Sequence, residues 1–176
     1  MKATRPGGDL VPIPDCYIQC GNNNTIEMKI LPDISDSKSA SYSDESIVGR
    51  SFPMKSFSHG ENRSISWTAH FVNCKEGDAE SLLEDLRSIE SCVYPDDEGT
   101  STPYSPPPIC KIKCGRILGE EELCVIMKSY SVKFPTDVAW DEDTYLPYKF
   151  DVDMSFDVVY DSTDLPGSDK IFSDGM

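Results

Sequence analysis

The sequence is poor in the residues that mark catalytic sites and membrane spans. Its 176 residues include only two histidines, His59 and His70, and neither belongs to a recognisable catalytic motif. Nucleophile-elbow, P-loop, zincin and dinucleotide-binding motifs are all missing. No apolar run approaches the ~18 residues that a membrane-spanning helix needs. We therefore expect no enzyme activity, no catalytic residue, no cofactor and no membrane contact.

Positive charge is also scarce. The chain has 16 Lys and Arg residues against 31 Asp and Glu residues, which gives a formal net charge of −15 at pH 7. Such a surface repels nucleic-acid phosphates and anionic lipids. The balance argues against a protein that grips DNA or RNA directly. The same charge balance leaves open a protein past which DNA moves without binding.

The cysteine count is odd, and the first fifteen residues show no apolar leader, so we expect reduced thiols in a cytoplasm. Four of the seven cysteines form two C-x-x-x-C pairs, Cys16/Cys20 and Cys110/Cys114. Residues four apart on a strand share a face but lie about 13 Å from each other, too far for one zinc ion to bind both. We therefore expect buried thiols that act as small hydrophobic side chains, and no metal site. The other cysteines are Cys74, Cys92 and Cys124.

Hydrophobic periodicity predicts a chain of strands. Apolar and polar residues alternate in the segments 16–31, 64–72, 109–118, 123–134 and 148–161. The first segment contains Gly-Asn-Asn-Asn, whose residues tolerate positive φ, and therefore predicts a hairpin. Gly-Glu-Glu-Glu joins the third and fourth segments and predicts a second hairpin.

One segment, 78–93, has the pattern of an amphipathic helix. Asp78 is placed to cap its start, and a proline lies just beyond its end. The apolar residues have the spacing of a stripe that packs on one surface. They are Leu82, Leu83, Leu86 and Ile89.

The remaining segments are typical of the loops and terminal extensions of a single domain. We expect an N-terminal arm at 1–14, a single β domain over 15–165 and a C-terminal tail at 166–176. Within the domain, 32–50 is a Ser-rich polar stretch that predicts a long loop, and 95–108 is a Pro-rich connection. The fold class that follows is α+β, mainly β: an antiparallel β-barrel or sandwich with one short helix.

The stretch FDVDMSFDVVYD, residues 150–161, allows two interpretations. Its acids resemble a calcium loop, but such a loop needs Gly at its sixth position and Glu at its twelfth. Counted from Asp151, those positions hold Phe156 and Ser162. The alternating apolar residues favour a strand instead. Asp151, Asp153 and Asp157 would then share the polar face of that strand.

The acidic stretch at 135–148 leaves an alternative open. It carries Trp140 and Tyr145 beside several acids, a composition compatible with a soluble β-rich module that binds a peptide or carbohydrate. An enzyme whose site shows no readable motif is a third hypothesis.

GENRSISWTAHF has the form R-x-I-x-W-x-x-x-F, and the leucine-rich helix AESLLEDLRSIES follows it. PPPICKIKCGRIL then leads a proline run into a strand that ends in glycine, and YLPYKFDVDMSFDVVY forms the closing strand. The order of these segments resembles the tail-tube-like proteins of contractile-tailed phages, and is most similar to the baseplate hub and tube-initiator type. The resemblance covers roughly residues 49–165, with the hairpin at 15–31 fitting before them.

The resemblance implies a structural component of a virion tail or baseplate, assembled in the host cytoplasm. Six copies would form a ring whose sheets join into one barrel around a DNA-conducting channel, next to tail-tube and baseplate-hub proteins. Such a ring would carry a formal charge of −90, six times −15, and would pass DNA without binding it. We hypothesise that Asp151, Asp153 and Asp157 line the channel; the alternative is that they face solvent or the neighbouring ring. Loop residues at the contact with a neighbouring subunit or ring would be Ser41, Tyr42 and Glu45; the alternative is a plain solvated loop.

Overall fold

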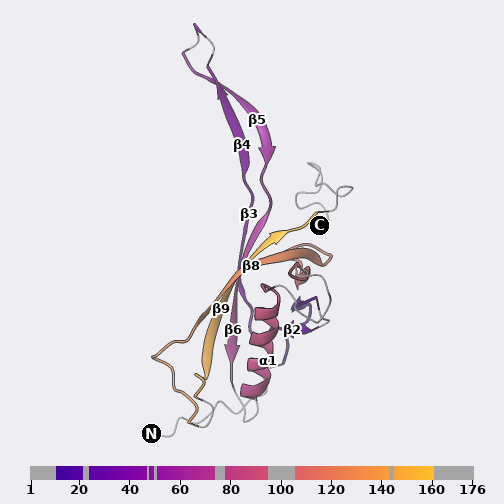
Figure 1. Ribbon diagram of the computed structural model, residues 1–176, viewed down its shortest axis with the longest axis vertical. Coiled ribbons are helices and arrows are strands. Elements are labelled where there is room, and N and C mark those ends of the chain that lie inside the picture. Colours follow the sequence, from indigo (N-terminus) through magenta and orange to yellow (C-terminus); the bar gives the residue numbers. More distant parts are fainter. Residues whose placement is uncertain are drawn as a thin grey trace.

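In the described part of the chain, the fold is an antiparallel sheet with one helix and a long β-ribbon that projects from it (Figure 1). The computed structural model describes residues 11–21, 24–46, 48–49, 51–73, 78–94, 106–142 and 145–160. Some expectations fall outside these residues: those on Cys74, on residues 1–10 of the N-terminal arm, on residues 95–105 of the Pro-rich connection and on the tail 166–176. No helix within the described ranges is long and apolar enough to cross a membrane.

Seven strands form the main sheet, and every neighbouring pair is antiparallel. In spatial order they are β2 (Thr25–Glu27), β1 (Cys16–Gln19), β7 (Cys110–Cys114), β8 (Leu123–Lys133), β9 (Lys149–Val158), β6 (Ser64–Val72) and β3 (Asp33–Ser37). The prediction of a mainly β, antiparallel α+β fold with one short helix is confirmed for the described residues. The sheet of the single chain is open and not closed into a barrel, because β2 and β3 each have one neighbour.

The predicted strands are largely those observed. The segment 64–72 is β6 without a change of bounds, and the stretch chosen as a strand over a calcium loop is β9. Both predicted hairpins form, as β1–β2 and β7–β8. β7 ends earlier than expected, at Cys114, because Gly115 adopts a φ of +50° that turns the chain out of the ladder.

Side chains on one face of β6 and β9 form the centre of the core. In the ladder between these strands, Trp67 stands opposite Met154 and Ile65 stands opposite Phe156. All four side chains are buried, with exposed fractions between 0% and 2%. Burying a large apolar side chain of this kind contributes roughly 1.5–3 kcal/mol, so this pair of strands anchors the sheet.

The helix α1 (Asp78–Ser91) packs its apolar stripe on the same core. Leu82 and Ile89 are buried, and Leu86 is partly buried. Leu83, which we expected in the stripe, is 37% exposed. The expectation was wrong because successive residues of a helix are rotated about 100° from each other around its axis. Asp78 was expected to cap the helix, but its side chain lies outside the part that the structure describes.

Residues 32–50, expected to form a long loop, are mostly strand. β3 is followed by β4 (Ala40–Glu45), and the chain returns as β5 (Met54–Gly60), which leads into β6. β4 and β5 pair with each other and extend beyond the main sheet; we call this pair the ribbon (Figure 1). The expectation was wrong because both faces of the ribbon are mostly exposed. A strand without a buried face shows no apolar alternation in its sequence.

Candidate functional site

The acidic side chains of β9 lie on the face opposite the core. Asp151, Asp153 and Asp157 alternate with buried residues along the strand and are themselves half-buried. Partners from β6 reach two of them. Thr68 Oγ1 donates a hydrogen bond to Asp153 Oδ1 at 2.7 Å, and His70 Nδ1 lies 2.6 Å from Asp151 Oδ1. Whether these carboxylates line a channel remains a prediction.

Lysines of β8 reach the same carboxylates. Lys128 Nζ lies 3.2 Å from Asp157 Oδ2, and Lys133 forms an ion pair with Asp153. The hydrogen bond from Lys133, aided by the one from Thr68, lowers the pKa of Asp153 below its ordinary value. The same contact raises the pKa of Lys133. The face therefore carries fixed charges of both signs, whereas the sequence suggested a row of bare carboxylates.

The three residues expected at a subunit contact all lie on β4, in the ribbon. Tyr42 stands opposite Phe57 and Glu45 stands opposite Met54, and the register shifts between Ser41 and Tyr42. Residues three apart on a strand point to opposite faces. Tyr42 and Glu45 therefore do not share one contact patch, and the aromatic face of the ribbon is the one that carries Tyr42.

That aromatic face is exposed. The rings of Tyr42 and Phe57 meet edge to face, with centroids 5.8 Å apart and planes at 74°. They remain 57% and 64% exposed. Asp44 and Lys55 form an ion pair of 2.9 Å two residues further along. Val48, Phe52 and Met54 are also exposed, but Met54 is the cross-strand partner of Glu45 and lies on the opposite face. An exposed aromatic pair such as Tyr42 and Phe57 is typical of a contact surface.

Arg63 fixes the base of the ribbon, where β5 passes into β6. Its Nε and Nη2 donate to the carboxylate of Asp36 on β3, at 2.9 Å to Oδ1 and 2.6 Å to Oδ2. Nη2 also lies 3.4 Å from the carbonyl oxygen of Leu118. The hydrogen bond to Asp36 raises the pKa of the guanidinium. This arginine belongs to the sequence pattern R-x-I-x-W-x-x-x-F, but no role was predicted for it from the sequence. The one sequence feature that could have indicated its role is its position directly before an alternating strand.

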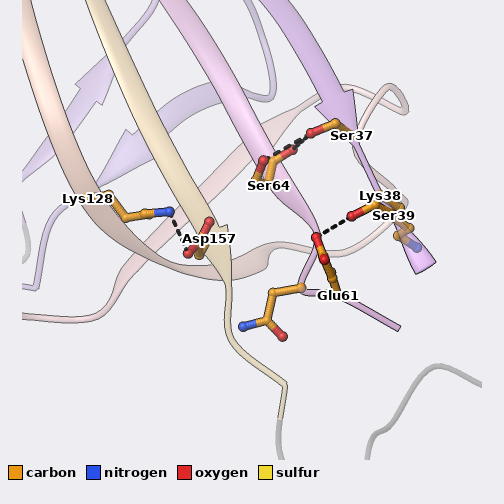
Figure 2. A pocket seen from close by; sticks show the side chains of 8 residues that line it. Ser37, Lys38, Ser39, Glu61, Ser64, Lys128 and Asp157 are labelled. Atoms are coloured by element: carbon orange, nitrogen blue, oxygen red, sulfur yellow. Dashed lines mark hydrogen bonds and ion pairs between the residues drawn. The ribbon is translucent and has the colours of Figure 1, made fainter. Parts of the chain in front are cut away.

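A shallow hollow of about 380 Å³ lies beside that base (Figure 2). Its lining residues are Ser37, Lys38, Ser39, Glu61, Asn62, Ser64, Lys128 and Asp157. Several of these side chains contact each other: the hydroxyls of Ser37 and Ser64 are 3.0 Å apart, and Ser39 donates to Glu61. Neither Trp140 nor Tyr145, the aromatic residues of the binding-module alternative, lines the hollow. Their side chains are 43% and 77% exposed.

The cysteine pairs meet across strands. β1 and β7 run antiparallel with Cys16 opposite Cys114, and the two Sγ atoms are 3.2 Å apart. At the other end of the pairing, the Sγ atoms of Cys20, Cys92 and Cys110 all lie within 4.8 Å of one another. These five thiols are buried, as expected. The spacing along one strand correctly predicted that the two cysteines of each C-x-x-x-C pair lie apart. It could not predict the contacts between cysteines of different strands.

Removing the Arg63 side chain is expected to loosen the base of the ribbon. Arg63→Ala removes the charged donor and leaves the Asp36 carboxylate without its paired hydrogen bonds. The substitution should therefore lower the free energy of unfolding by about 1–3 kcal/mol. Urea unfolding followed by far-UV circular dichroism measures this. Arg116→Ala, at an exposed turn position, is the matched control and should stay within about 0.5 kcal/mol of the parent chain. Equal effects of the two substitutions would contradict the assigned role.

The ion pair of Asp153 predicts a pH dependence of stability. Its folded pKa is lowered, so its contribution is complete above the unfolded pKa of about 3.9 and is lost as pH falls through the lower folded value. Asp153→Asn should therefore be less stable than the parent chain at pH 7, and the difference should shrink in acid. Urea titrations between pH 2 and pH 7 measure it, with Asp137→Asn on the exposed connection as the control. A difference that grows on acidification is incompatible with this role.

Comparison with known proteins gives no relative from which a function follows. No protein-family model matches the sequence, and no curated protein matches it either. The function is therefore proposed from the geometry of the ribbon, the open sheet and the polar face of β9.

Proposed function

We propose that this protein is a structural, non-enzymatic subunit of a contractile phage tail or baseplate. Six copies form a ring at the junction of hub and tube, where it initiates or extends the tail tube. The observation that carries this proposal is the ribbon, which projects from the sheet (Figure 1) and whose aromatic face is exposed. The resemblance of its sequence segments, in order and pattern, to tail-tube-like proteins adds to it.

The ribbon supports assembly because it has little stability of its own. An isolated two-stranded ribbon is marginal in water, and this one buries almost none of its side chains. A neighbouring copy of the chain is the proposed partner of the face around Tyr42 and Phe57. Contact with it would remove two large aromatic surfaces from water and hold the ribbon in one conformation.

The open sheet supports ring formation in the same way. Among the described strands, its two edges, β2 and β3, each have a neighbour on one side only, and such edges offer backbone donors and acceptors to another chain. In a ring with a head-to-tail interface, the edge of one copy meets the other edge of the next, and the last copy closes on the first. Six open sheets joined in this manner make the continuous barrel of the tail-tube type.

The polar face of β9 is the proposed channel wall. Because Lys128 and Lys133 lie against the carboxylates, local repulsion of DNA is weaker than the acids alone would give. The net charge of −15 on each copy supplies the long-range repulsion that keeps phosphates from binding. The paired lysines hold the carboxylates in place, and the carboxylates in turn neutralise the charges of Lys128 and Lys133.

A soluble module that binds a peptide or carbohydrate is the second candidate. The observation that favours it is the exposure of Trp140 and Tyr145 within an acidic connection. Exposed aromatic rings beside carboxylates are suited to stacking on a sugar or a basic peptide. A module of this kind would work as a monomer, which separates the two candidates by their oligomeric state.

Electron microscopy of the purified full chain at increasing concentration tests the proposal. We expect six-fold rings for the parent chain. The double variant Tyr42→Ser, Phe57→Ser should keep the β-rich circular dichroism spectrum but form rings only at concentrations at least about tenfold higher, because it lacks the aromatic contact.

Tyr145→Ser is the matched control, because it removes an exposed aromatic residue from outside the ribbon, and it should assemble like the parent. A parent chain that stays monomeric at every concentration, and that binds a sugar or peptide through Tyr145, would falsify the ring and establish the alternative.

A further inference from the structure

Three buried thiols from three separate elements converge at one point. Cys20 follows the last residue of β1, Cys92 follows the last residue of α1, and Cys110 is the first residue of β7. Their Sγ atoms all lie within 4.8 Å of one another. The exposed fractions of the three residues are 2%, 0% and 0%. Residues far apart in the sequence thus supply one compact group of sulfur atoms.

The strand register accounts for two of the three positions. In the β1–β7 ladder, Gln19 stands opposite Lys111, so Cys20, the residue after β1, meets Cys110. The third thiol comes from the end of the helix. There the amide of Cys92 donates to the carbonyl oxygen of Ile89 at 3.1 Å, and the buried Ile89 side chain holds that turn against the core.

A close backbone approach keeps the first two thiols at a fixed separation. Gly21 follows Cys20 and packs on Pro108, two residues before Cys110. A Cβ atom added at Gly21 would lie 2.3 Å from Pro108 Cβ, a distance that real contacts do not allow. Only glycine fits, and the turn after β1 is therefore pressed against the segment that enters β7.

The chemistry of the group suits a soft metal ion. Thiolate ligands select Zn²⁺ and Cu⁺ over harder ions. Sulfur atoms about 2.3 Å from a tetrahedral zinc are about 3.8 Å apart, so the spacing of at most 4.8 Å needs only a small contraction. Among the described residues, no histidine or carboxylate joins the group. The site therefore offers three sulfur ligands, a set that Cu⁺ accepts as it stands and that Zn²⁺ completes with one further ligand.

We propose that Cys20, Cys92 and Cys110 form a structural site for one thiophilic, closed-shell metal ion, Zn²⁺ or Cu⁺. The ion would tie the end of α1 to the β1–β7 pair, next to the β2 edge of the sheet. Binding replaces thiol protons by metal–sulfur bonds and releases those protons to solvent, with no change of oxidation state. The metal site does not depend on the proposed ring.

Metal titration of the full-length chain tests the site. The protein is reduced, stripped with a chelator under anaerobic conditions and titrated separately with Zn²⁺ and with Cu⁺ against a chromophoric competitor. We expect one equivalent of at least one ion per chain, together with a raised melting temperature, because an ion that binds the folded state stabilises it. The ion with the lower dissociation constant is the occupant. Failure of both ions to bind a chain whose thiols all react after denaturation would overturn the proposal.

Variants then locate the bound ion. Cys92→Ser and Cys110→Ser should abolish stoichiometric binding, whereas Cys114→Ser, in the neighbouring thiol pair, and Cys124→Ser, at an exposed thiol, should retain it. Gly21→Ala keeps all three ligands but displaces Cys20, so it should weaken binding by about 10- to 100-fold. Stoichiometric binding that survives Cys92→Ser, or that needs Cys124, would show that the ion sits elsewhere.

Two measurements on the unmutated chain avoid the risk that a variant fails to fold. X-ray absorption at the metal edge should show a first shell of sulfur at about 2.3 Å. Alkylation followed by peptide mass spectrometry should show that the ion protects Cys20, Cys92 and Cys110, while Cys124 reacts at an unchanged rate. A first shell of nitrogen and oxygen only, or no protection of the three thiols, would refute the site.

Discussion

The nine-residue antiparallel pairing of β6 with β9 is the interaction on which the rest of the structure depends. It aligns the alternation of two strands, so that Trp67 and Phe156 enter the core while Asp151 and Asp153 enter the opposite face. The same pairing sets the start of β6, and therefore the point where Arg63 holds the ribbon. A shift of one residue would send every acid into the core, which the cost of burying charge forbids.

The sequence predicts the parts of the fold that have one buried face. β6 and β9 follow from period-two alternation, and α1 follows from its apolar stripe, because burial selects the residues at those positions. The ribbon could not be predicted in this manner. Its serine-rich strands bury neither face, and their pairing comes from backbone hydrogen bonds and cross-strand contacts such as Ser43 with Ser56, whose hydroxyls are 2.7 Å apart.

The candidate sites also contain features that local alternation predicts and contacts that it does not predict. The shared polar face of Asp151, Asp153 and Asp157 followed from alternation, but the lysine and histidine partners did not, since they depend on which strands are neighbours. The meeting of Cys20 with Cys110 depends on a pairing between residues ninety positions apart in the chain. A single sequence carries no local signal of such a contact. The ribbon, the open edges and the lysine-paired acidic face are the features from which we propose an assembly of identical subunits around a channel.

The central claim is that the ribbon is a contact made between copies of the chain. Hydrogen exchange at the backbone amides of β4 and β5, compared between the dilute chain and the assembled ring, tests it most directly. The account predicts fast exchange in the dilute chain, since both faces of the ribbon are exposed, and strong protection on assembly, while the β6–β9 ladder is protected in both states. Equal exchange of the ribbon amides in the two states would contradict the account.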